Sequence, residues 1–108
     1  MSLQTQEINA RIYGRFVSEP LRKEGARSTL YANFHEIKPP FLARLQHSPS
    51  GLPKSGWADI DESAVEIGEG IADHTQAWSE NVMPEGTMLR MVVECNSAYL
   101  ENIKLLSA

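Results

Sequence analysis

The chain has 108 residues and a formal net charge of −4, with 42% hydrophobic and 22% charged residues. This length and balance are typical of one folded domain and exclude a largely disordered chain. The single cysteine, Cys95, excludes an internal disulfide, and no apolar run is long enough for a transmembrane helix. No basic region followed by an apolar core opens the sequence, so we expect one cytoplasmic domain over residues 1–108 with no membrane partner.

The charges are distributed unevenly along the sequence. Residues 1–54 hold 8 Lys/Arg and 4 Asp/Glu, whereas residues 55–108 hold 2 and 10. The first half therefore carries +4 and the second half −8. Such asymmetry indicates a basic side that could face a polyanion, although an acidic surface without any binding role is an equal alternative.

The first two predicted elements are strands, because apolar and polar residues alternate in each. The first run covers residues 8–16 and should end before Pro20, which cannot donate a ladder hydrogen bond. The second places Leu30, Ala32 and Phe34 on one face and ends at Pro39-Pro40. A basic connection separates the two runs, so we expect an antiparallel pair joined by a loop over residues 22–27.

The middle of the sequence predicts a short strand, a loop and a helix. Residues 41–45 form a short strand or one helical turn, residues 46–56 a surface loop rich in Pro, Gly and Ser, and residues 57–60 a brief third strand. Ser63 to Glu66 fit a capping box. Helical spacing then relates Ile67, Ile71, Thr75, Trp78 and Val82. We expect one helix here, ending near residues 81–83 before Pro84 and Gly86.

The last predicted elements are two strands over residues 87–95 and 99–106, separated by the turn residues Asn96 and Ser97. The complete order is strand, strand, short strand, helix, strand, strand. This order predicts an all-β or β-rich fold, namely a small five-stranded OB-like barrel with one helix between the third and fourth strands.

The stretch Glu7–Ile37 resembles the start of bacterial single-stranded DNA-binding proteins. The matching positions are Gly14, Arg15, Phe16, Glu19, Pro20, Arg22, Gly25 and Phe34, and Glu85-Gly86-Thr87 looks like the turn into that family's fourth strand. The resemblance implies a single OB-like domain over residues 1–108 that binds single-stranded nucleic acid with little sequence preference. It also favours DNA over RNA as the partner, with RNA left as an alternative, and implies assembly into a homo-oligomer.

The candidate binding residues come from the outer faces of the first two strands and from their connection. Aromatic rings on a sheet can stack unstacked bases, and cations can pair with the phosphate backbone. The residues selected on this basis are Arg11, Tyr13, Arg15, Arg22, Lys23, Arg27, Tyr31 and His35. The alternative is that the two tyrosines belong to a second layer of packing.

No pattern in the sequence indicates catalysis. The three histidines have no metal-ligand spacing, Gly68-Glu69-Gly70 lacks the form of a phosphate loop, and Cys95 lies in an apolar run typical of an inert buried thiol. We therefore expect no enzyme activity, no metal and no cofactor. Two alternatives to nucleic-acid binding remain: a small protein-interaction module, and an acidic mimic that inhibits a nucleic-acid-binding protein.

Overall fold

The computed structural model describes residues 1–48 and 56–108, and these contain strands and loops but no helix. Three strands are long and four are short. Their bounds are β1 Ser2–Val17, β2 Leu21–Arg22, β3 Ser28–Ser48, β4 Ala58–Asp59, β5 Val65–Glu66, β6 His74–Glu80 and β7 Met88–Ser107. The all-β class is therefore confirmed. No helix of the described residues is long and apolar enough to cross a membrane.

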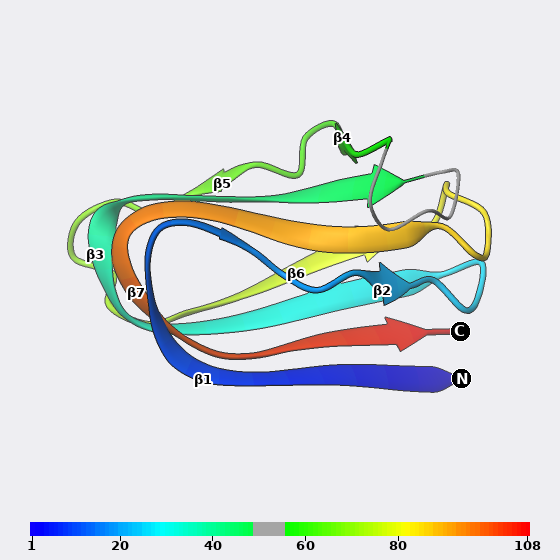
Figure 1. Ribbon diagram of the computed structural model, residues 1–108, viewed down its shortest axis with the longest axis horizontal. Helices are drawn as coiled ribbons and strands as arrows, with labels where there is room; N and C mark the ends of the chain where they lie inside the picture. The colour runs from blue at the N-terminus through cyan, green and yellow to red at the C-terminus, as the bar shows by residue number, and fades with distance from the viewer. Residues whose placement is uncertain (49–55) are drawn as a thin grey trace.

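Strands β1, β3 and β7 each fold back on themselves, which turns one antiparallel sheet into two layers (Figure 1). In one layer the first part of β1 pairs with the last part of β7, which pairs with the first part of β3, and β6 adds to β3. In the other layer the remaining arms of the same three strands pair again, with β2, β4 and β5 at the edges. The result is an open β-sandwich whose bend lies at one end and whose termini lie together at the other (Figure 1).

The bend coincides with breaks in the register of all three long strands. Pairing shifts between Glu7 and Ala10 on β1, again between Tyr13 and Gly14, and between His35 and Phe41 on β3. Gly14 has φ +63°, a left-handed conformation that glycine adopts without steric cost. Pro39 and Pro40, joined by a cis peptide bond, lack N–H donors and lie where the ladder is interrupted. The prolines thus mark a corner within β3, and the expectation that they end the strand is wrong.

The core lies between the layers and is built from alternating residues of the long strands. Each layer contributes large, fully buried side chains, among them Leu30, Phe34, Leu45, Met91, Leu100 and Leu105. Phe34 and Phe41 lie on opposite sides of the corner in β3 and meet edge to face with ring centroids 4.9 Å apart. Aromatic pairs favour this geometry, so the contact supports the folded-back shape of the strand.

The predicted helix is wrong, because residues 74–80 form strand β6. Of the helically spaced residues, only Ile67 and Trp78 are buried, whereas Ile71 is 47% and Val82 91% exposed. Ser63 does not cap a helix: its hydroxyl accepts a hydrogen bond from the Leu45 N–H at 3.0 Å. The buried side chains of β6 alternate along the strand, so a period of two governs this segment.

The predicted five-stranded OB-like barrel is also wrong, because the sheet stays open and folds into two layers. The first two predicted strands are not partners: β1 and β3 both pair with β7, which lies between them. The expected break at Asn96 and Ser97 is a register shift within β7. Residues 41–45 belong to strand β3, which was one of the two alternatives for this segment. The short strand predicted at residues 57–60 is β4. Residues 49–55 of the predicted surface loop lie outside the described part of the chain.

Candidate functional site

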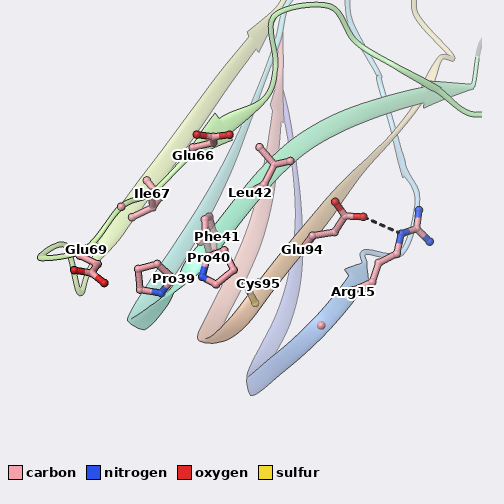
Figure 2. A pocket seen from close by; sticks show the side chains of 12 residues that line it. Arg15, Pro39, Pro40, Phe41, Leu42, Glu66, Ile67, Glu69, Glu94 and Cys95 are labelled. Carbon is pink, nitrogen blue, oxygen red and sulfur yellow. Dashed lines mark ion pairs between the residues drawn. The ribbon is translucent and has the colours of Figure 1, made fainter.

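A hollow of about 640 Å³ opens at the bent end of the sandwich, and we name it the bend pocket (Figure 2). Its floor is apolar and comes from the corner of β3 and the segment after β5. The floor residues are Pro39, Pro40, Phe41, Leu42 and Ile67. Small-molecule sites are commonly concave, 300–1,000 Å³ in volume and largely apolar, with a few polar groups that orient the ligand. The bend pocket has this construction.

One wall of the bend pocket carries a paired cation and carboxylate. Figure 2 shows Arg15 of β1 joined to Glu94 of β7, with an Arg15 Nε to Glu94 Oε1 distance of 3.8 Å. Arg44 approaches the same carboxylate from β3, with its Nη1 3.2 Å from Glu94 Oε2. Because Arg44 also donates to Asp59 at 3.1 Å, Glu94 is held by a fixed network. The more exposed Arg15 keeps guanidinium donors free for a ligand.

The opposite wall carries Glu66 and Glu69, which lie across the hollow from Arg15 (Figure 2). Neither carboxylate forms an ion pair with any residue of the described chain. One arginine and three glutamates give the lining a formal charge of −2. The bend pocket is therefore unfavourable for phosphate or another anion and suits a neutral or cationic ligand.

Cys95 also lines the bend pocket but has no reactive environment. Cys95 is 9% exposed, and burial raises the pKa of its thiol above the ordinary value. The thiolate is the nucleophilic form, so a raised pKa makes this cysteine a poor nucleophile at neutral pH. This agrees with the interpretation of Cys95 as an inert thiol.

A second, more polar hollow of about 400 Å³ lies beside the bend pocket, and we name it the Tyr13 hollow. It is lined by Arg11, Tyr13, Glu36, Lys38 and Ser97. Arg11 forms an ion pair with Glu36, and its Nη1 lies 3.4 Å from the Ser97 hydroxyl. Tyr13 is 67% exposed, so its ring is open to solvent.

The candidate residues predicted from the sequence do not form one platform. Tyr13 lies opposite Ser97 of β7, whereas Tyr31 lies opposite Lys104. These partners are seven residues apart on β7, which corresponds to roughly 20 Å along an extended strand. Tyr13 and Tyr31 therefore cannot stack neighbouring bases on adjacent strands, as the sequence interpretation required.

His35 lies on β3 near the bend and is bound by two carboxylates. Its Nε2 is 2.8 Å from Glu101 and its Nδ1 is 3.2 Å from Asp73. The hydrogen bonds to Glu101 and Asp73 raise the pKa of His35 above its usual value of 6.5. Because both ring nitrogens are occupied, His35 is held in a surface network and is not available to a nucleic-acid backbone.

The three basic residues of the β2–β3 segment have different environments. Arg22 and Arg27 are exposed, but Lys23 is fully buried. The expectation that Lys23 reaches a passing backbone is therefore wrong. Its ammonium group donates to Glu80 at 2.6 Å and to the carbonyls of Ala26 and Met83 at 2.9 and 2.6 Å. This pair ties the β2–β3 loop to the end of β6, far from the bend.

Only Arg15 among the predicted site residues lines the bend pocket, and sequence reasoning missed the rest of it. The sequence pattern predicts a strand end at Pro39-Pro40, and it places Glu66, Gly68 and Glu69 in a helix. Two glycines within three residues are unfavourable in a helix and could have indicated a loop there. Within the described residues, no group of three or more His, Cys, Asp or Glu is placed to hold a metal ion.

No protein-family model matches this sequence, and no curated protein matches it. The solved structures similar in fold include TmCBM61 in complex with β-1,4-galactotriose, with a TM-score of 0.58 and 10% identity over 98% of this chain and 82% of that one. They also include the Yersinia pseudotuberculosis-derived mitogen, with a TM-score of 0.46 and 18% identity over 96% of this chain and 82% of that one. At 10% identity the likeness to TmCBM61 shows the fold alone.

The likeness in fold to TmCBM61 and the open, folded-back sheet overturn the resemblance to single-stranded DNA-binding proteins, because the chain does not form the barrel that this resemblance implies. The prediction of single-stranded nucleic-acid binding relied on that resemblance and on a shared face for Tyr13 and Tyr31. The structure contradicts both, so the predicted nucleic-acid function and the predicted nucleic-acid partner are wrong. The likeness in fold does not favour the protein-interaction module or the acidic mimic either.

Proposed function

We propose that this chain is a non-catalytic binding protein that takes a neutral saccharide in the bend pocket. The observation that carries the proposal is the pocket itself: a hollow of about 640 Å³ with an apolar floor, between the Arg15–Glu94 pair and Glu66. A sugar ring presents apolar C–H faces and a rim of hydroxyls. It can pack on Pro39, Pro40 and Leu42 while its hydroxyls donate to carboxylates and accept from a guanidinium.

The charge of the lining supports a neutral ligand over an acidic one. With Glu94 neutralised by two arginines, Glu66 and Glu69 remain as free acceptors for hydroxyl donors. Hydrogen bonds to charged acceptors are stronger than those between neutral groups, so Glu66 and Glu69 are favourable partners for ligand hydroxyls. The likeness in fold to TmCBM61, solved with β-1,4-galactotriose, makes that trisaccharide a reasonable first probe.

Binding without catalysis is part of the same proposal. The buried thiol of Cys95 has a raised pKa, and His35 lies outside the lining of the bend pocket. The lining otherwise offers carboxylates and one guanidinium, which are sufficient to bind a sugar.

Gly68 allows a direct test because it lines the bend pocket with space around it. A Cβ added there would meet no heavy atom within 4 Å, and the backbone is not in the left-handed region. Gly68→Tyr should therefore fill the hollow and leave the fold intact. Isothermal titration with β-1,4-galactotriose should show binding by the wild type and an affinity loss of at least about tenfold in Gly68→Tyr.

The matched control is Gly68→Ala, which adds a single methyl group at the same place and should bind nearly as well as the wild type. Circular dichroism should show the same β spectrum for all three proteins. Wild-type protein that gives no heat with β-1,4-galactotriose or with a panel of other neutral oligosaccharides would overturn the proposal. If Gly68→Tyr bound with the same affinity as the wild type, the ligand would not bind in the bend pocket.

A further inference from the structure

The bend pocket and the Tyr13 hollow occupy neighbouring rows of the same three strands. One row runs from Tyr13 of β1 through Ser97 of β7 to Lys38 of β3. The next row runs from Gly14 through Cys95 to Phe41. The first row belongs to the Tyr13 hollow and the second to the bend pocket. The two hollows are therefore adjacent along the strands, with the register shifts of the bend between them.

From this adjacency we infer that the two hollows are successive subsites for one oligosaccharide, with the terminal residue in the bend pocket and the chain continuing over Tyr13. The inference rests on the proposed function of the bend pocket. It adds a second site and a ligand class, namely a linear neutral oligosaccharide rather than a single sugar.

The Tyr13 hollow has the groups that such a second subsite needs. Tyr13 is 67% exposed, although an aromatic side chain contributes most to stability when its surface is covered. Arg11 is already oriented by Glu36 and by the Ser97 hydroxyl, so its donors are fixed before a ligand arrives. Lys38 supplies a further donor on the β3 side. One face of a sugar can cover the ring while its hydroxyls meet these fixed polar groups.

The backbone at this subsite supports a binding role. Glu36 has φ +50°, a left-handed conformation that is uncommon for a residue other than glycine. Such conformations are retained where the surrounding structure holds them and are frequent at binding sites. The Glu36 carboxylate pairs with Arg11, and both residues line the hollow.

The test measures how affinity depends on oligosaccharide length. Galactose, β-1,4-galactobiose and β-1,4-galactotriose are titrated into the wild type, Tyr13→Ala and the control Tyr31→Ala. The inference predicts wild-type affinity that rises with length and a loss of about tenfold for galactotriose in Tyr13→Ala. The affinity of Tyr13→Ala for galactose should stay within about twofold of the wild type, and Tyr31→Ala should resemble the wild type throughout.

The outcomes separate this inference from the proposed function. Length-independent affinity, or unchanged galactotriose affinity in Tyr13→Ala, overturns the second subsite while binding in the bend pocket stands. An equal loss for galactose and galactotriose in Tyr13→Ala also overturns it, because Tyr13 would then act on the first sugar. A wild type that binds none of the three sugars, nor any other neutral oligosaccharide of the panel, overturns both.

Discussion

Lys23 and Glu80 form a buried ion pair that joins the two loops at the open end of the sandwich. The Lys23 side chain is 0% and that of Glu80 7% exposed, and the Nζ to Oε2 distance is 2.6 Å. The remaining polar atoms are satisfied, because Lys23 also donates to two carbonyls and Glu80 accepts from the N–H groups of Val82 and Met83. A fully bonded pair of this kind tolerates the removal of both charges better than the removal of one.

Replacing Lys23 with Met should therefore lower the free energy of unfolding by about 3–5 kcal/mol, because Glu80 would keep a buried, unpaired charge. The double variant Lys23→Met/Glu80→Leu should recover much of the loss. Arg27→Met is the matched control on an exposed neighbour and should change stability by less than about 0.5 kcal/mol. Urea unfolding measures all four proteins. A single variant as stable as the control would show that the pair is unimportant.

The same pair gives stability an acid dependence. Burial alone raises the pKa of Glu80, but hydrogen bonds from Lys23, Val82 and Met83 and the Lys23 charge outweigh it, and the pKa lies below its usual value. A lowered folded-state pKa contributes stability above the unfolded pKa of about 4.3, and this is lost as pH falls through the folded-state pKa. Between pH 5 and pH 3, the wild type should lose more unfolding free energy than Glu80→Gln. Parallel pH profiles would contradict this.

His35 should give a dependence of opposite sign. Its pKa is raised above 6.5 by hydrogen bonds to Glu101 and Asp73, so its contribution is complete below that value and is lost as pH rises through the folded-state pKa. As the pH rises through the folded-state pKa of His35, the urea midpoint of the wild type should fall relative to that of His35→Gln. NMR titration of the His35 ring gives the pKa directly, and a value at or below 6.5 would contradict the assignment.

Trp78 anchors β6, the strand that the sequence pattern predicts as a helix. Its side chain is 7% exposed, and its indole N–H donates to the Ser63 carbonyl at 2.7 Å. Trp78→Phe should cost about 1–3 kcal/mol of unfolding free energy, since the buried Ser63 carbonyl loses its partner. The exposed position Val82 is the control, and Val82→Ala should be nearly neutral. Thermal unfolding followed by far-ultraviolet circular dichroism measures both variants.

The sequence pattern predicts where the long strands lie but not where they bend. Alternation along β1, β3 and β7 predicts strands correctly, because one face of each is less exposed than the other. At Pro39-Pro40 and Asn96-Ser97 the same residue types that end a strand instead turn a corner, and local sequence does not distinguish the two. Which strand pairs with which is set mainly by contacts between residues far apart in the sequence, such as Leu30 with Leu105. Local periodicity carries no information about such partners.

The candidate site could not be predicted either, because it also depends on which strands pair. Arg15 is close in space to Glu94 only because β1 and β7 are neighbours, and Glu66 reaches the bend pocket only because β5 pairs with β3. The buried position of Lys23 depends on Glu80, which no local pattern connects to it. Single residues such as Tyr13 can be selected from the alternation of polar and apolar residues. Which residues lie next to them in space depends on the fold.

Amide chemical-shift mapping with β-1,4-galactotriose tests the central claim most directly, because it locates the ligand as well as detecting it. We predict that the largest shifts fall on the amides of Gly14, Leu42, Ile67 and Gly68, all in the lining of the bend pocket. Smaller shifts should reach Tyr13 and Ser97. Amides of β6, at the far edge of the sheet, should not move. Shifts centred on β6, or none with any neutral oligosaccharide at millimolar concentration, would contradict saccharide binding at the bend.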